Sequence, residues 1–288
     1  MRKKFNLVVV FFLILGSTAH FSLAADEIIS DKMIEKQRSK LADNTKNLGY
    51  GPQSPRDLST LKGTNSRKFN AAPSYIEMNL CNIHLHKNAE HKGGEFNTYA
   101  GNGNGKGYGT GYKYDGKLSV EELLPFEKEV GVNEYGHLKP GDTIEVHYVY
   151  STAAVKPGPS LNYCLDENTH NPQLRVEAQV YVLVNDPSAL DFAMLTRHEI
   201  LSGFYQAPNI PKNTGVAVEY SGSTTGPDYN ETGSHYQVTW NVRLQVEKVS
   251  ISSLDTWFNN NIYDEDDAHA VRNLVINPDL LSVIKTLD

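Results

Sequence analysis

Short runs of alternating apolar and polar residues dominate the chain from residue 75 onward. The clearest are 76–86 (IEMNLCNIHLH), 142–150 (DTIEVHYVY), 175–184 (RVEAQVYVLV), 215–220 (GVAVEY) and 236–251 (YQVTWNVRLQVEKVSI), separated by Gly, Pro, Asn and Asp. Alternation with a period of two is typical of strands that turn one face to a core. We therefore expect a mainly β (α+β) fold with a central twisted sheet and a few peripheral helices.

Helical patterns are fewer. Residues 119–130 (SVEELLPFEKEV), the segment around 187–195 and residues 250–268 are candidates. Residues 25–74 are mostly polar, with one amphipathic stretch at 26–43, and we interpret them as an N-terminal extension of a main domain over 75–288. The glycine-rich segment 100–116 lacks the phosphate-loop pattern and predicts a flexible surface loop.

The N-terminus has the features of a secretory signal. Arg2, Lys3 and Lys4 precede an apolar run, and the small residues Ser22 and Ala24 suit cleavage after residue 24. Cleavage removes three positive charges and no acidic ones, so the formal net charge of -7 becomes -10. This acidic balance excludes nucleic acid as the expected partner. We expect residues 1–24 to be a signal peptide and the mature protein to be exported, periplasmic or secreted, with no stable membrane span.

Cys81 and Cys164 are the two cysteines of the chain. In an oxidising compartment such a pair predicts one disulfide, and two buried thiols are the alternative.

The histidines indicate a metal site. In "NIHLH" a strand would place His84 and His86 on one face, and in "DTIEVHYVY" it would place His147 beside Glu145 on one face. If the two strands are neighbours, three imidazoles meet. Three neutral imidazoles suit Zn2+ with water at the fourth position, which is the arrangement of a catalytic site. Glu145 or Glu90 could orient a ligand imidazole.

Other histidines lack such a pattern. We expect ordinary core or surface side chains at His137, His170, His198, His235 and His269.

These motifs resemble those of the carbonic anhydrases. "IHLHKNAEH" followed by "IEVH" is similar to the His-x-His strand, Glu-His pair and Glu-x-His strand of the α class. "EYSGSTTGPDYNE" followed by "VTWNVRLQVEKVSISS" resembles that class's Tyr-x-Gly-Ser-Leu-Thr-Thr-Pro-Pro segment and Val-x-Trp strand. The signature "CNIHLHKNAEHKGGEF" is more similar to the δ class. The second proline and the α-class cysteine are replaced here, and the α-class proton-shuttle histidine has no counterpart.

The resemblance implies a carbonic anhydrase-like catalytic domain over 75–288 that hydrates CO2 reversibly to bicarbonate and a proton through a zinc-bound hydroxide. It implies His84, His86 and His147 as ligands of one Zn2+, with Glu145 supporting the third ligand. CO2 and bicarbonate are the implied small-molecule partners, and a homo-oligomer remains open.

The resemblance also implies roles around the metal. Glu90 matches a buried acid that accepts a hydrogen bond from a threonine hydroxyl, which orients the hydroxide. That threonine is Thr225 in one alignment and Thr224 in another. His91 is our candidate for a proton carrier.

Two alternatives remain open. His84, His86, Glu90 and His147 also resemble the four ligands of a cupin, in which iron or manganese is as suitable as zinc. A non-catalytic exported binding protein on the same scaffold is the other alternative.

Overall fold

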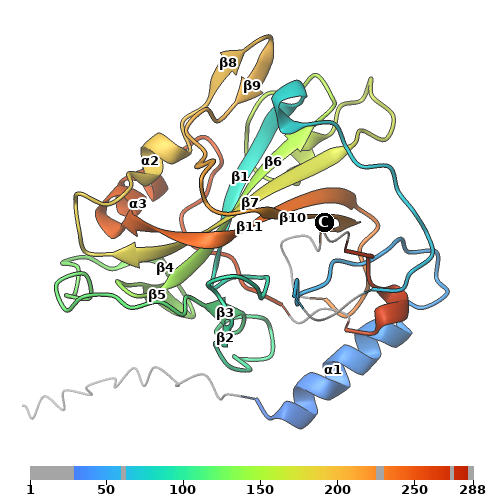
Figure 1. Ribbon diagram of the computed structural model, residues 1–288, viewed down its shortest axis with the longest axis horizontal. Coiled ribbons are helices and arrows are strands. Elements are labelled where there is room, and N and C mark those ends of the chain that lie inside the picture. The colour runs from blue at the N-terminus through green and yellow to red at the C-terminus, as the bar shows by residue number, and fades with distance from the viewer. Residues whose placement is uncertain (1–28, 60–62, 225–229, 273–275, 285–288) are drawn as a thin grey trace, which may run out of the picture.

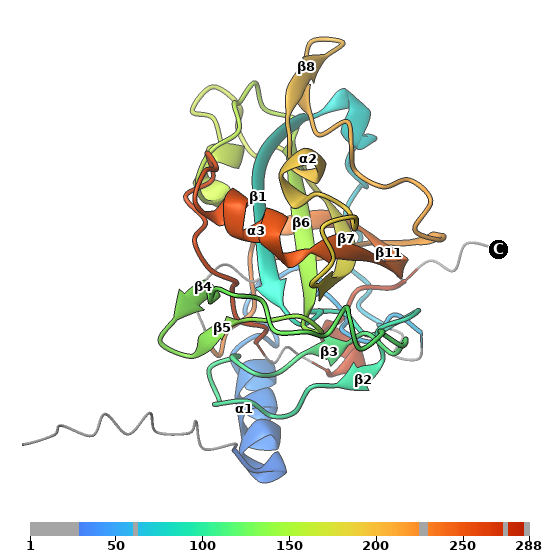
Figure 2. The same ribbon diagram turned by 90° about the vertical axis from the view of Figure 1, so that its left-hand side faces the viewer.

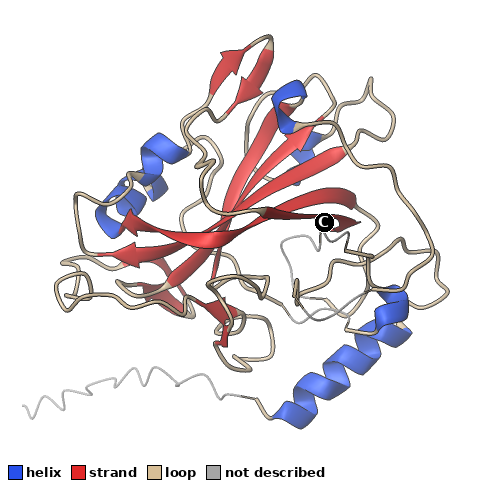
Figure 3. Cartoon of the chain, viewed as in Figure 1, coloured by secondary structure: helices blue, strands red, loops and turns tan. Residues whose placement is uncertain are grey.

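A central five-stranded sheet organises the molecule, which is described here by a computed structural model. The structure describes residues 29–59, 63–224, 230–272 and 276–284. In spatial order the strands of the sheet are β1 (Asn79–Lys87), β6 (Thr143–Ser151), β7 (Leu174–Val184), β11 (Gln237–Ser250) and β10 (Ala217–Ser223). Strands fan out along a pronounced twist, and few helices accompany them (Figures 1 and 3). The expected mainly β architecture is confirmed.

The sheet is mixed. β1 pairs with β6, β6 with β7, and β10 with β11 in antiparallel fashion, whereas β7 and β11 are parallel. Opposite residues of an antiparallel pair share a face. The register places His84 opposite His147 and His147 opposite Ala178.

Each face of the sheet has its own core. One is lined by Ile83, Leu85 and Tyr148 and is covered by the helices α2 (Phe192–Leu195) and α3 (Ile251–Phe258). Figure 2 shows α3 running across this face. The other core contains Val149, Ala178 and Trp240 on the histidine-bearing face. Both faces are therefore buried, and polar side chains at the sheet need partners there.

Smaller elements surround the sheet. They are α1 (Asp31–Asp43), the 3-10 turns η1 (Tyr75–Glu77), η2 (Leu161–Cys164) and η3 (Pro278–Leu280), and the paired strands β2 (Thr98–Tyr99) with β3 (Tyr112–Lys113), β4 (Val130–Asn133) with β5 (Gly136–Leu138), and β8 (Glu199–Leu201) with β9 (Phe204–Gln206). The β8–β9 hairpin projects from the body (Figure 1). Among the described residues, no helix is long and apolar enough to span a bilayer.

The helix predictions had mixed outcomes. The stretch at 26–43 forms α1 from Asp31, with Ser30 as N-cap, and residues 26–28 lie outside the described residues. α2 and α3 occupy only parts of 187–195 and 250–268. The prediction of a helix at 119–130 is wrong. The segment makes a single turn, in which Leu123 N donates to Ser119 O. Pro125 follows that turn and cannot continue it as a helix.

The glycine-rich segment is a loop packed against α1. Ile29 N donates to Gly103 O, and Gln37 Nε2 donates to Gly105 O. Glycine stands at every second position from Gly101 to Gly111, and each of these glycines has positive φ, which explains the alternation of glycine in this sequence. The flexibility predicted for this loop stays a prediction.

Residues 50–58 of the predicted N-terminal extension are largely buried. Gln53 N bonds to Leu280 O, and Ser54 Oγ donates to Ser223 O at the end of β10. This segment therefore packs beneath the same face of the sheet that carries the histidines. The predicted signal peptide, residues 1–24, lies outside the described residues.

Candidate metal centre

Strands β1 and β6 bring His84, His86 and His147 together. The ring centroids of His84 and His147 lie 5.0 Å apart, those of His86 and His147 4.8 Å, and those of His84 and His86 5.4 Å. All three side chains are buried, with 2–8% of each residue exposed. The alternation inferred from the sequence therefore holds, and the strand pairing adds the third imidazole.

Two of these rings are held through Nδ1. His84 Nδ1 lies 2.6 Å from Asn82 Oδ1, and His86 Nδ1 lies 2.9 Å from the carbonyl oxygen of Ala270. Because both partners are acceptors, each Nδ1 carries the proton. Nε2 of each ring is then an unprotonated nitrogen suited to a metal ion.

The third ring, that of His147, is held through Nε2 instead of Nδ1. His147 Nε2 donates to Glu145 Oε1 over 2.9 Å, which leaves His147 Nδ1 as the unprotonated atom. That atom lies 3.1 Å from His84 Nε2. Two nitrogens about 2.0–2.1 Å from one tetrahedral zinc would be roughly 3.3–3.4 Å apart. The spacing and the donor set thus fit zinc.

Burial keeps the first two imidazoles neutral. It lowers the pKa of His84 well below 6.5, helped by the neighbouring His147, and it lowers the pKa of His86 to about 4. A neutral imidazole is the form that binds a metal. The site is therefore in its ligating state at neutral pH without any proton release from these two rings.

A buried network stands behind His147. Glu145 Oε1 accepts from His91 Nδ1 over 2.7 Å as well as from His147, and Glu145 Oε2 accepts from His91 N over 3.1 Å. His91 Nε2 lies 2.6 Å from the Tyr220 hydroxyl. Burial alone would raise the pKa of Glu145, but the attraction of His91 and the hydrogen bonds from His147 and His91 outweigh it and hold that pKa well below its usual value. Glu145 is therefore an ionised acceptor.

The position of His91 bears on its predicted role. Its side chain is fully buried, and both ring nitrogens are occupied by Glu145 and Tyr220. Proton transfer from His91 to solvent would have to break one of these bonds. The proton-carrier role stays a prediction, and the contacts fit an orienting role better.

Glu90 forms a buried ion pair that the sequence did not indicate. Arg56 Nη1 lies 3.0 Å from Glu90 Oε2, and Arg56 Nη2 donates to Glu90 Oε1 over 3.3 Å. Burial opposes ionisation of Glu90, yet Arg56, and then His86 and His147, hold its pKa well below its usual value. Arg56 comes from residues 50–58 and completes the site from the N-terminal part of the chain.

Glu90 also approaches two of the imidazoles. Its oxygens lie 3.9 Å from His86 Nδ1 and 3.9 Å from His147 Nε2. These are the nitrogens already bonded to Ala270 and Glu145, not the ones left for a metal. Glu90 thus lies nearest the nitrogens of these two rings that already have partners, although His86, Glu90 and His147 each offer a possible ligand atom within 4.8 Å of the others.

A fourth histidine, His269, adjoins the site, which the sequence did not predict. Its ring stacks on that of His84 with centroids 5.3 Å apart, and its Nε2 lies 2.9 Å from Glu265 Oε2. His84, His86 and His269 also form a group with ligand atoms within 4.8 Å. Backbone hydrogen bonds from His269 N to Leu85 O and from Lys87 N to His269 O explain this position. The Glu265-His269 spacing of four residues is the one signal that could have pointed to the pair.

The site opens into a cavity of about 480 Å3. Ser160 and Asn162, at the start of η2, line this cavity, as do Glu265 and His269. Thr224 also lines this cavity, while Thr225 lies outside the described residues, so the choice between the two threonines stays a prediction.

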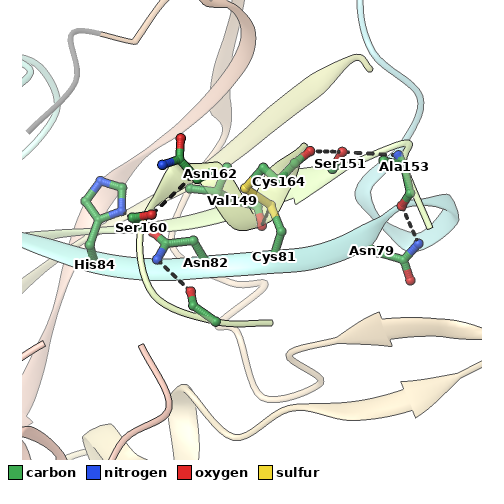
Figure 4. The surroundings of a disulfide bond; sticks show 11 residues. Asn79, Cys81, Asn82, His84, Val149, Ser151, Ala153, Ser160, Asn162 and Cys164 are labelled. Atoms are coloured by element: carbon green, nitrogen blue, oxygen red, sulfur yellow. Dashed lines mark hydrogen bonds between the residues drawn. A yellow bond between two sulfur atoms is a disulfide. The ribbon is translucent and has the colours of Figure 1, made fainter. Parts of the chain in front are cut away.

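The predicted disulfide is present and fixes one wall of the cavity. Cys81 and Cys164 are bonded, which joins β1 to η2 (Figure 4). A register shift between Leu80 and Asn82 accompanies the position of Cys81 in the core of the histidine-bearing face. Asn82 Nδ2 donates to Gly158 O over 3.1 Å, so the residue that holds His84 also holds this loop.

Comparison with models of known protein families identifies a matching family. The family model described as delta carbonic anhydrase matches residues 75–253. A search of curated proteins found no match. Residues 75–253 cover more than half of the chain, and the family assignment rests on that match alone.

Similar solved structures were found at low identity. An α-carbonic anhydrase from Thermovibrio ammonificans, in complex with sulfanilamide, is 15% identical over 77% of this chain and 84% of that chain, with a TM-score of 0.28. An α-carbonic anhydrase from Photobacterium profundum is 15% identical over 86% and 95%, with a TM-score of 0.31. A halotolerant carbonic anhydrase from Dunaliella salina is 16% identical over 82% and 88%, with a TM-score of 0.34.

Proposed function

The chain belongs to the delta carbonic anhydrase family, and from this premise we propose that His84, His86 and His147 hold one zinc ion at which CO2 is reversibly hydrated to bicarbonate and a proton. One observation carries the proposal. In each ring one nitrogen is bonded to a protein acceptor, which leaves His84 Nε2, His86 Nε2 and His147 Nδ1 for the metal. Three protein ligands leave a position for solvent.

When bound, zinc supplies a Lewis acid that lowers the pKa of water and makes a hydroxide nucleophile available near neutral pH, an effect for which carbonic anhydrases are the established example. The protein contributes orientation. Glu145 accepts from His147 Nε2 and from His91 Nδ1, and the Tyr220 hydroxyl holds His91 at its Nε2. Such outer contacts fix ring direction and raise the basicity of the ligand.

Glu90 supplies an oriented acceptor beside the ligands. Arg56 binds both of its oxygens, so the carboxylate is held ionised and in one rotamer. We propose that the hydroxyl of Thr225 or Thr224 donates a hydrogen bond to Glu90. Because its proton is used in this way, the threonine oxygen can only accept a hydrogen bond from the nucleophile. This would orient the lone pair of the nucleophile toward CO2.

The cupin alternative draws on the group of His86, Glu90 and His147. Glu90 faces His86 Nδ1 and His147 Nε2, so a metal bound between these groups would require the two rings to give up their hydrogen bonds to Ala270 O and Glu145. Loss of such buried hydrogen bonds is costly. Metal identity separates the two cases, because a carboxylate in the ligand set favours iron or manganese. A non-catalytic binding protein would bind zinc without turnover.

We also propose that the protein is exported, periplasmic or secreted, after removal of residues 1–24. The Cys81–Cys164 disulfide supports this, since such bonds persist in oxidising compartments. Edman sequencing of the protein recovered outside the cytoplasm should begin at Ala25. An intact N-terminus at Met1 would contradict the proposal.

Stopped-flow CO2 hydration by the chain without residues 1–24 tests the catalytic proposal, with metal content measured on the same sample. We expect about one zinc per chain and fast hydration, both lost in His84→Ala. His170→Ala is the matched control, because His170 is exposed in a loop. Bound iron or manganese without hydration would favour the cupin alternative, and bound zinc without hydration would favour a binding protein.

A further inference from the structure

A second cavity lies on the far side of Glu90 and is lined by several arginines. Its volume is about 170 Å3, and Glu90 lines both this cavity and the one at the histidines. Its walls come from α1, from residues 56–57, from the start of β3 and from the C-terminal part of the chain. The chemically important wall residues are Arg38, Arg56, Asp57, Glu90, Tyr112 and Arg272.

The two carboxylates of this cavity already have cations. Glu90 is paired with Arg56 over 3.0 Å, and Asp57 is paired with Lys92 over 2.9 Å. Arg272 Nη1 donates to the carbonyl oxygen of Asn230. Arg38 differs, because its side chain has no hydrogen-bond or ion-pair partner within the described parts of the chain.

Glu90 offsets the charge of Arg56, and Asp57 is paired with Lys92, whereas Arg38 forms no ion pair with either carboxylate. Arg56 is at least nine-tenths buried, and Arg38 is half-buried. An anion in the cavity would therefore give the Arg38 guanidinium a partner. The guanidinium fork binds planar and tetrahedral oxyanions through two parallel hydrogen bonds.

We propose that this cavity, with the Arg38 guanidinium as its principal donor and Arg56 Nε as a second, is a binding site for one small oxyanion. The volume sets the class of ligand, since a water molecule takes about 30 Å3 and the cavity has room for a bicarbonate or sulfate with a few waters but not for a nucleotide. The site does not use the histidines. Anion binding at this site can therefore be tested separately from zinc binding and CO2 hydration.

Thermal unfolding of the zinc-free chain lacking residues 1–24 tests the site, because removal of zinc prevents anions from binding at a metal. Sodium bicarbonate or sodium sulfate is added at constant ionic strength, balanced with sodium chloride. A ligand that binds only the folded chain raises its stability in a saturable way. We expect saturation in the wild type and a half-saturation concentration raised at least about tenfold in Arg38→Gln, which corresponds to the loss of a charged hydrogen-bond pair.

Arg197→Gln is the matched control, since the Arg197 side chain is 60% exposed and remote in sequence from the cavity. Its titration should match the wild type. Stabilisation by bicarbonate alone supports a site for planar oxyanions, and stabilisation by both salts supports a general oxyanion site. The absence of saturation, or an equal loss in Arg38→Gln and Arg197→Gln, overturns the proposal.

Discussion

Asn82 and His84 are joined by a 2.6 Å contact between Asn82 Oδ1 and His84 Nδ1. The two residues lie two positions apart on β1, so they share a face of the strand. The same asparagine amide donates to Gly158 O. The orientation of one proposed ligand and the position of a cavity loop thus depend on a single side chain.

Replacement of Asn82 by leucine should weaken zinc binding. The ring of His84 would lose the acceptor that fixes its tautomer, and loss of such a contact typically costs about 10–100-fold in metal affinity. Chelator competition measures the dissociation constant. Asn79→Leu is the control on the same strand, since Asn79 contacts Ala153 and Tyr205 instead. Equal affinities for wild type and Asn82→Leu would show that the contact does not orient the ligand.

His147 and His269 should differ as ligands. His147 Nδ1 lies 3.1 Å from His84 Nε2 with Glu145 behind the ring, whereas His269 Nε2 is bonded to Glu265. We expect His147→Ala to lose zinc on desalting and His269→Ala to retain about one zinc per chain. The reverse result would move the metal to the group of His84, His86 and His269.

Loss of one partner of the buried Arg56–Glu90 pair should lower the free energy of unfolding more than loss of one partner of an exposed ion pair. Breaking a buried pair leaves one charge without a partner and typically costs about 3–5 kcal/mol. Arg56→Met should therefore lower the free energy of unfolding by that amount in urea, and Arg56→Met/Glu90→Gln should recover much of it. Lys128→Ala, which removes an exposed partner of Asp255, should cost no more than about 1 kcal/mol. If the double variant is as unstable as Arg56→Met, the unpaired charge is not the cause.

Acid should destabilise the zinc-free protein in a defined pH window. The pKa of His86 is lowered by burial from 6.5 to about 4, so the unfolded chain binds more protons than the folded chain between these values. Stability then falls as the pH drops from 6.5 and levels off for this group below about 4, a loss on the order of 3 kcal/mol. Urea unfolding at a series of pH values measures it. A His86→Asn variant should show a smaller slope, and parallel curves would contradict the assignment.

Local alternation was enough to predict much of the site. It placed His84 and His86 on one face and His147 with Glu145 on one face, and both strands formed as expected. Asn82 could have been added by the same rule, because it precedes His84 by two residues. The prediction of a helix at 119–130 was wrong because it rested on hydrophobic spacing alone and did not take into account that Pro125 ends the turn.

Other parts of the site were out of reach of pattern reasoning. Arg56 and Ala270 come from irregular segments that have no periodicity, and they reach β1 through long-range packing. His269 joins the cluster through backbone pairing with β1, which no spacing within its own segment encodes. Burial of residues 50–58 likewise depends on contacts with β10 and with Leu280.

The pairing of residues 268–270 with β1 has a consequence for biosynthesis. β1 is the edge strand of the sheet, and Ala270 supplies the acceptor for His86 Nδ1. A nascent chain carries His84, His86 and His147 long before residue 270 leaves the ribosome. Until then the edge of β1 is open to pairing with other chains, a known route to aggregation. The proposed metal-binding geometry is therefore completed only after residues 268–270 have docked on β1, which favours metal loading late in folding over loading of an isolated β1–β6 pair.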